Sequence, residues 1–166
     1  IGSQMIFGAP VETRKGIGGM QIDGEFFHYI LGKLGASAGH LDPEKKGRTM
    51  CELFGAYGWD FGVRDMRYLL DQLLVRGINN LVPHAFSMAQ YPDPDCPPHF
   101  YAGGNNGQFS WFKELMYYAN RMCEKLSGGT HVAQTALLYD GEADWAGEHM
   151  LMQKPGRALQ CSQIEF

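Results

Sequence analysis

RTMCELFGAYGW, residues 48–59, is the stretch that decides the fold. Its apolar part predicts a short strand, and Glu52, Tyr57 and Trp59 gather towards the C-terminal end of that strand. An amphipathic helix at 63–75 and a second strand at 78–86, which carries His84, are expected directly after it. Because strand, helix and strand joined by short connections form a βαβ unit, we expect the two strands to be parallel. The sequence therefore predicts an α/β fold.

Further elements are expected on both sides of this unit. Apolar residues recur with helical spacing at 26–38, and Asp42-Pro43 ends that helix because the residue before a proline avoids helical angles. Ser110 can cap another helix, which Gly128-Gly129 stops. The remaining predictions are strands at 5–11 and 132–139, a long polar loop at 87–109 and a polar loop at 141–147.

Composition narrows the class of protein. The chain has 166 residues, 45% hydrophobic and 13% aromatic, which is enough for an ordinary globular domain with a core. Its net charge of −4 comes without a basic stripe, so nucleic acid is not an expected partner. No apolar run approaches the ~20 residues of a membrane span, and no signal peptide is visible at the start. We expect neither a nucleic-acid nor a membrane partner.

Cofactor and metal motifs are not found. The four cysteines contain no CxxC pair and the six histidines no HxxxH or HxH pair, so no metal site is expected. The glycines of 16–19 and 103–104 do not form a dinucleotide fingerprint between a strand and a helix. A phosphate-binding α/β enzyme stays open as a minor alternative, since it needs only free backbone amides at a helix N-terminus. We expect no cofactor.

Several segments together resemble a known family. They are FHYILGKLGAS (27–37), DP (42–43), CELFGAYGW (51–59), VRGIN (75–79) and VPHAFS (82–87). This pattern is similar to the later half of large multidomain bacterial (β/α)8-barrel glycoside hydrolases, related to the α-L-rhamnosidase and family 2-like β-glycosidase groups. The resemblance implies that residues 1–130 are the C-terminal part of a TIM-type barrel. It also implies that residues 131–166 begin a second α/β domain, similar to glutamine amidotransferases.

The resemblance implies expectations about the partners of the chain and about its cellular location. A closed barrel needs eight βα units and about 250 residues. The remainder of its own barrel, or another copy of the chain in a homo-oligomer, is therefore an expected partner, and carbohydrate is the expected substrate. A bacterial cytoplasmic or periplasmic location is left open.

Glu52 is the leading catalytic candidate. Glycoside cleavage needs two carboxyl groups, about 5 Å apart for retention of configuration and wider for inversion. Glu52 could serve as acid/base or as nucleophile. The alternative is a purely structural role, in a salt bridge with Arg48 or Arg64. The second carboxyl is not identified by the sequence; Glu12 is the best of the candidates, and a residue outside this chain is the other possibility.

Four further residues are candidates for substrate binding. His84 could bind a sugar hydroxyl or orient Glu52, or be a core histidine. Tyr57 and Trp59 could stack on a pyranose face, or simply pack in the core. Gln21 could offer its amide to the substrate, or belong to a turn. The alternative function from another class is a non-catalytic carbohydrate-binding or assembly fragment.

Overall fold

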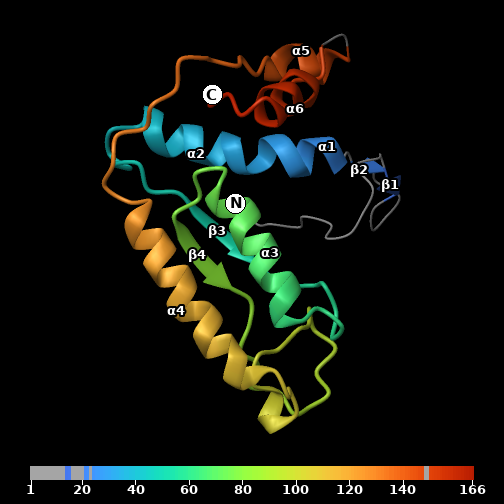
Figure 1. Ribbon diagram of the computed structural model, residues 1–166. Coiled ribbons are helices and arrows are strands. Elements are labelled where there is room, and N and C mark those ends of the chain that lie inside the picture. Colours follow the sequence, from blue (N-terminus) through green and yellow to red (C-terminus); the bar gives the residue numbers. More distant parts are fainter. Residues whose placement is uncertain (1–13, 16–20, 23, 148–149) are drawn as a thin grey trace.

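The structure, a computed structural model, describes residues 14–15, 21–22, 24–147 and 150–166, and side chains from residue 24 onwards (Figure 1). Its central sheet consists of β3 (Met50–Leu53) and β4 (Asn80–Pro83). The two strands are parallel, with Cα partners from Met50↔Asn80 to Leu53↔Pro83. A smaller antiparallel pair, β1 (Arg14–Lys15) with β2 (Gln21–Ile22), is separate from this sheet.

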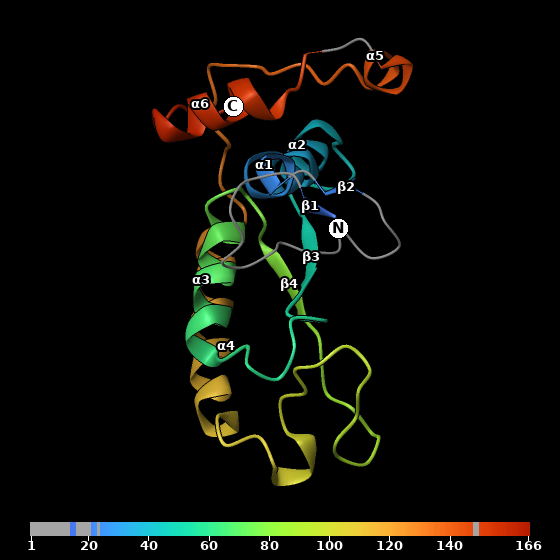
Figure 2. The ribbon, with the colours of Figure 1, turned by 90° about the vertical axis from the view of Figure 1, so that its right-hand side faces the viewer.

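Two helices cover one face of the central sheet. Helix α3 (Val63–Leu74) connects the strands, and α4 (Phe109–Lys125) follows β4 after a long loop that contains the short helix η3 (Ala102–Gly104). Both helices lie on the same side of the strands (Figure 2). Apolar residues three and four apart on the helices point at the sheet, which is why they are buried. The core residues of the two helices are Met66, Leu69, Leu70, Leu73, Leu74, Phe112, Leu115 and Ala119.

A second layer begins with one long helical stretch. It is composed of α1 (Gly24–Phe26), the π-helical turn η2 (Phe27–Leu31) and α2 (Gly32–Leu41). Helices α5 (Gly141–Ala146) and α6 (Gln153–Cys161) lie beyond this stretch, on the side away from α3 (Figure 1). Helix α6 packs closely, because a Cβ at Gly156 would lie 2.3 Å from Cδ1 of Ile30.

Most of the predicted elements are confirmed. The α/β class, the parallel βαβ unit and the helix that ends at Asp42 are all present. The helix expected to follow a Ser110 cap is present as α4, but it begins at Phe109 with Gln108 at the N-cap, so Ser110 lies inside the helix and the predicted cap is wrong. Gly77, with a φ of +92°, ends the turn after α3 in a backbone conformation that favours glycine. Strand β4 is shorter than the predicted 78–86, since beyond it the Ala85 N–H donates to the Pro98 carbonyl instead of to β3. The predicted strand at 5–11 lies outside the described residues.

Two predictions about the C-terminal segment are wrong. Residues 132–139 form no strand, because no other described strand lies beside them to complete a ladder. Val132 and Leu138 are correspondingly exposed. The predicted loop at 141–147 is mostly helix α5, which begins where the Asp140 carboxylate accepts a hydrogen bond from the Ala143 N–H at 3.0 Å. Helix α6 was not predicted at all.

No helix in the described part of the chain combines the length and the apolar character that crossing a bilayer requires.

Candidate functional site

The predicted site residues of the central sheet lie at the C-terminal ends of β3 and β4, where two loops meet. Residues 54–61 follow β3 and residues 84–100 follow β4. Residues 96–100, at the end of the second loop, bond both to the first loop and back to Ala85. The bonds are Ala56 N–H to Cys96 O at 3.2 Å, Gly58 N–H to Pro97 O at 2.9 Å, Ala85 N–H to Pro98 O at 3.4 Å and Phe100 N–H to Ala85 O at 3.0 Å. The two loops therefore form one connected surface.

Glu52 is exposed on the face of β3 that the helices leave open. Its neighbours Cys51 and Leu53 are buried, because successive side chains of a strand point to opposite faces. Across the sheet its Cα partner is Val82. Glu52 forms no ion pair with Arg48 or Arg64, all three being described residues. The structural salt bridge that was the alternative role for this carboxylate is thus not observed.

His84 lies against the loop that follows β3. Its N–H donates to the Leu53 carbonyl at 2.8 Å, which extends the β3–β4 pairing by one residue. The imidazole ring covers Gly55 so closely that a Cβ there would lie 2.9 Å from its Cγ and its Nδ1. Nδ1 is buried and has no hydrogen-bond partner among the described residues. His84 therefore combines a fixed position with an unused nitrogen.

Tyr57 is placed mainly by packing. Its ring stacks on Phe61 with centroids 4.4 Å apart and an interplanar angle of 19°. Its hydroxyl is buried and finds no partner in the part of the chain that the structure describes. Burial, helped by the nearby Cys51 thiol, raises the pKa of Tyr57 well above its usual range. One face of this ring is thus already occupied by Phe61.

Trp59 forms an exposed aromatic pair with Tyr91. The ring centroids are 5.3 Å apart at an interplanar angle of 76°, and the two residues are 38% and 44% exposed. Trp59 also meets the ring of His99 edge to face, at 5.4 Å and 88°. His99 is only 2% exposed, and its Nε2 lies 2.8 Å from the Asp95 carbonyl. Sequence reasoning singled out Trp59 and missed Tyr91; the only available signal was the presence of aromatic residues in a long loop.

Asp93 holds the loop beneath this pair. The Ser87 hydroxyl donates to its Oδ2 at 2.5 Å, and the Asp95 N–H donates to its Oδ1 at 3.0 Å. Nδ1 of His99 lies 3.7 Å from Oδ2. The hydrogen bond from Ser87 contributes most, and with the Asp95 N–H and His99 it lowers the pKa of Asp93. The carboxylate therefore stays ionised and fastens residues 87–99 to one another.

Negative charge dominates this surface. The hydrogen bond with the Asp95 side chain and some burial raise the pKa of the Cys96 thiol, and the charges of Asp95, Glu52 and Asp93 raise it further. Glu52 therefore lies within electrostatic reach of the loop that follows β4. Gln21, by contrast, pairs with Lys15 in the separate β1–β2 pair, and its side chain is outside the described part of the chain, as is Glu12.

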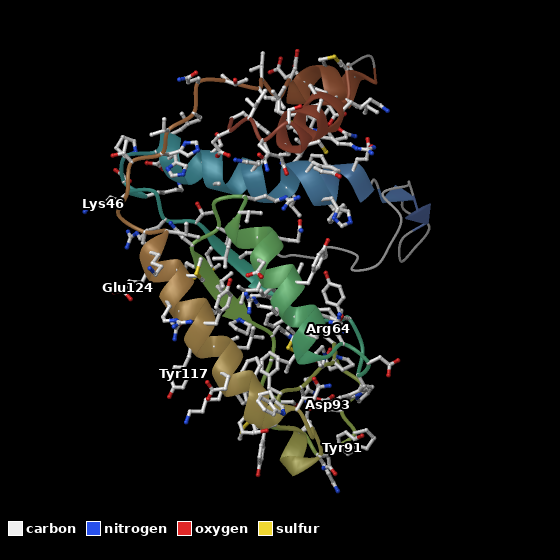
Figure 3. All side chains as sticks on the ribbon, in the orientation of Figure 1. Lys46, Arg64, Tyr91, Asp93, Tyr117 and Glu124 are labelled. Carbon is white, nitrogen blue, oxygen red and sulfur yellow. The ribbon has the colours of Figure 1, made fainter. Side chains whose placement is uncertain are left out.

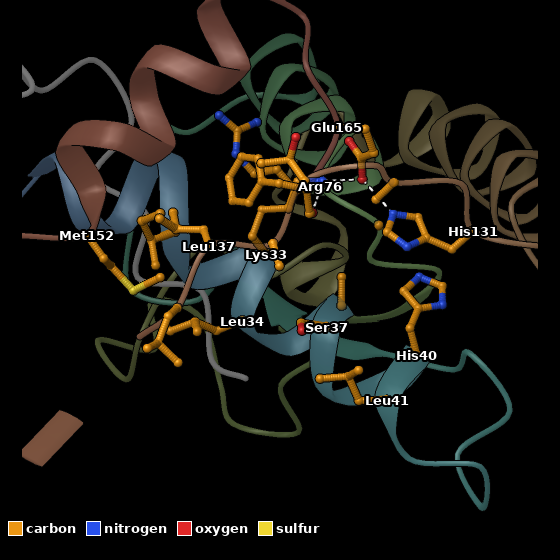
Figure 4. A pocket seen from close by; sticks show the side chains of 18 residues that line it. Lys33, Leu34, Ser37, His40, Leu41, Arg76, His131, Leu137, Met152 and Glu165 are labelled. Atoms are coloured by element: carbon orange, nitrogen blue, oxygen red, sulfur yellow. Dashed lines mark hydrogen bonds and ion pairs between the residues drawn. The ribbon is translucent and has the colours of Figure 1, made fainter. Parts of the chain in front are cut away.

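A cavity lies away from these residues, between α2 and the C-terminal segment (Figure 4). Its volume is about 400 Å³. Lys33, which is buried, pairs there with Glu165, whose Oε1 also lies 2.7 Å from Nε2 of His131. The rings of His40 and His131 stack at 4.3 Å. Although burial acts in the opposite direction, the hydrogen bonds from Lys33 and His131 lower the pKa of Glu165. These polar groups are largely satisfied by one another.

Neither metals nor relatives identify the site. Within residues 24–147 and 150–166, no three His, Cys, Asp or Glu side chains lie close enough together to hold a metal ion. Comparison with protein-family models, with curated proteins and with solved structures finds no match to this chain. The function must therefore be argued from the strand ends themselves.

Proposed function

We propose that this chain is the C-terminal part of a (β/α)8 glycoside hydrolase barrel with the start of a following α/β domain, and that Glu52 takes part in cleaving a glycosidic bond. The observation that carries the proposal is the position of Glu52. Its side chain is exposed, whereas the residues before and after it are buried, and it lies near the C-terminal end of a parallel strand. In (β/α)8 enzymes, catalytic residues come from the C-terminal ends of the strands.

The open face of the sheet supports the barrel. Parallel sheets are ordinarily covered on both faces, yet Met50, Glu52, Asn80 and Val82 are exposed opposite the face that α3 and α4 cover. Among the described residues, no further strand pairs with β3 or with β4. In a barrel the helices form the outer layer, and the remaining strands would cover these four side chains from inside. We take the rest of the same barrel to be the partner of this face; a second copy of the chain is the alternative.

The chemistry needs Glu52 and one more carboxyl group. As general acid, Glu52 would give its proton to the glycosidic oxygen while the bond from that oxygen to the anomeric carbon breaks, and the second carboxyl, as a carboxylate, would take a proton from the water that adds to the carbon. As nucleophile, its oxygen would form an ester with the anomeric carbon, the other carboxyl would protonate the leaving group, and water would hydrolyse the ester. We place the second carboxyl on a strand outside the described residues. Trp59 offers an exposed ring to the sugar, whereas Nδ1 of His84 is buried and would reach a sugar hydroxyl only if the His84 ring moved.

A glycosidase assay tests this proposal. Nitrophenyl glycosides would be offered to the 166-residue chain and to the full-length natural protein that contains it, each with and without Glu52→Gln. Loss of at least about 10³-fold in kcat with unchanged folding is expected in the full-length variant, because a positioned carboxyl contributes rate factors of that order. The control is Glu44→Gln, in the exposed turn before β3. Equal activity of the two variants would remove Glu52 from the chemistry.

Binding of carbohydrate without cleavage is the second candidate. It is favoured by the exposed Trp59–Tyr91 pair, since aromatic rings that combine exposure with a fixed position suit the apolar face of a sugar. A full-length protein that binds oligosaccharides but hydrolyses none of the glycosides would support this reading over the first.

A further inference from the structure

The loops at the strand ends have a one-sided charge. Residues 49–62 and 77–112 contain no lysine and no arginine. Their ionisable carboxylates are Glu52, Asp60, Asp93 and Asp95. At neutral pH these loops therefore repel an anionic substrate, and they contain no lysine or arginine that could pair with it.

The nearest basic residues along the chain are Arg48, Arg64, Arg76 and Lys113. Arg48 precedes β3 and donates through Nε to the Lys45 carbonyl, and Lys113 lies on α4 with its Nζ 5.5 Å from the centroid of the Tyr117 ring. Arg76 is buried, and its guanidinium donates to the carbonyls of His28 and Gln72. Arg64, at the start of α3, lies at the same end of the molecule as Asp93 and Tyr91 (Figure 3) and lines a groove between α3 and α4, so it is a single positive charge beside four carboxylates. Lys46 lies beyond the opposite, N-terminal end of β3, far from the labelled Tyr91 and Asp93 (Figure 3).

The exposed pair of Trp59 and Tyr91 lies on this acidic surface and is held in a fixed position. Trp59 is held by the backbone bond of Gly58 to Pro97 and by its edge-to-face contact with buried His99. Tyr91 belongs to the loop that Asp93 fastens internally. A rigid aromatic surface loses little conformational entropy when a ligand stacks on it, so its binding energy is retained.

We propose that Trp59 and Tyr91, set edge to face, form a platform for one pyranose ring at the end of the strand that carries Glu52, with one aromatic ring stacked on the sugar and the other against its edge, and that the carboxylates of these loops select an uncharged or amino sugar over a uronic acid or a sulfated or phosphorylated sugar. This inference rests on the proposed function and names the substrate class of that site. The platform supplies stacking, which is tolerant of sugar identity. The carboxylates supply discrimination, because like charges brought together in a partly desolvated site repel each other.

Kinetics of the full-length protein test the platform. Tyr91→Ala is expected to raise KM for the best neutral nitrophenyl glycoside by roughly 10-fold with kcat nearly unchanged, since a ring contact is worth about one factor of ten. Tyr91→Phe keeps the ring and should retain the original KM. Trp111→Ala removes a more exposed aromatic ring on α4 and is the matched control. An unchanged KM in Tyr91→Ala would overturn the platform.

Paired substrates test the charge selection. The β-glucoside is compared with the β-glucuronide, and the galactoside with the galacturonide, each as the nitrophenyl derivative. We expect the neutral member to have the higher kcat/KM by roughly 10-fold or more. Asp60→Asn should narrow that ratio, whereas Asp65→Asn on α3 should not. Equal turnover of both members would overturn the charge selection while leaving hydrolysis by Glu52 in place.

A binding measurement separates this inference from the proposed function. If no glycoside is hydrolysed, the proposed function fails. Cello- and xylo-oligosaccharides would then be titrated into the full-length protein and followed by tryptophan fluorescence, with Trp59→Phe as the comparison. A response that depends on Trp59 and weakens in Tyr91→Ala would retain the platform, and no response to either sugar would reject it.

Discussion

Replacing Gly55 with alanine tests whether His84 is positioned as the structure shows. The added Cβ would lie 2.9 Å from Cγ and Nδ1 of His84 and 3.3 Å from its Cβ, whereas ordinary contact begins at 3.4 Å. The ring would therefore have to retreat by about 0.5 Å. The backbone cannot simply follow, because the His84 N–H is bonded to Leu53 O at 2.8 Å.

The magnitude follows from two opposing terms. Overfilling a packed site typically costs about 1–3 kcal/mol. Gly55 is not among the residues with positive φ, so alanine would recover about 0.4–1 kcal/mol by reducing the freedom of the unfolded chain. We expect Gly55→Ala to lower the free energy of unfolding by about 1–2 kcal/mol.

Urea unfolding and NMR of the histidine rings provide the assay. The control is Gly107→Ala, where the new Cβ would have no neighbour within 4 Å and the backbone is not strained. The His84 ring signals, assigned with His84→Gln, should shift in Gly55→Ala and stay in place in Gly107→Ala. If Gly55→Ala matches its control in stability and in the His84 signals, the ring does not lie over Gly55.

Two further outcomes are expected. Leu69→Ala should lower the free energy of unfolding by about 2–5 kcal/mol in urea, because Leu69 is 1% exposed and a cavity would remain; exposed Tyr68→Ala is its control, and equal losses would contradict the core assignment. The pKa of Asp93 is lower in the folded loop than the value of about 3.9 expected in the unfolded chain. Ionised Asp93 therefore stabilises the folded loop at pH values above about 3.9, and this stabilisation is lost as the pH falls through the lower pKa of the folded state. An acid transition in Trp59 fluorescence should therefore disappear in Asp93→Asn, whose loop has already lost the ionised acceptor of Ser87; an identical transition in the variant would refute this role.

The elements of the βαβ unit could be predicted because their signals are local. The buried stripe of α3 repeats every three to four residues, and the alternation around Glu52 repeats every two. Asp42-Pro43 and Gly77 act on the chain within a few residues of themselves. Such patterns are readable without knowledge of the rest of the fold.

The C-terminal segment shows the limit of this reading. Residues 132–139 have the apolar character of a strand, yet a strand also needs a neighbour to complete its hydrogen bonds. The described chain provides none, and the segment is irregular. Helix α6 packs on the long N-terminal helix through contacts such as Gly156 with Ile30, which no local pattern announces.

The sequence by itself determined that the chain forms a parallel βαβ unit and that Glu52 alternates with buried Cys51 and Leu53, because propensity and periodicity act between near neighbours. Only the tertiary structure decided which face of the sheet stays open and which loop residues join the site. Tyr91 reaches Trp59 across a loop without periodicity, held by backbone hydrogen bonds whose partners are far apart in sequence. Contacts of that kind depend on the path of the whole loop, so they exist only once the chain has folded.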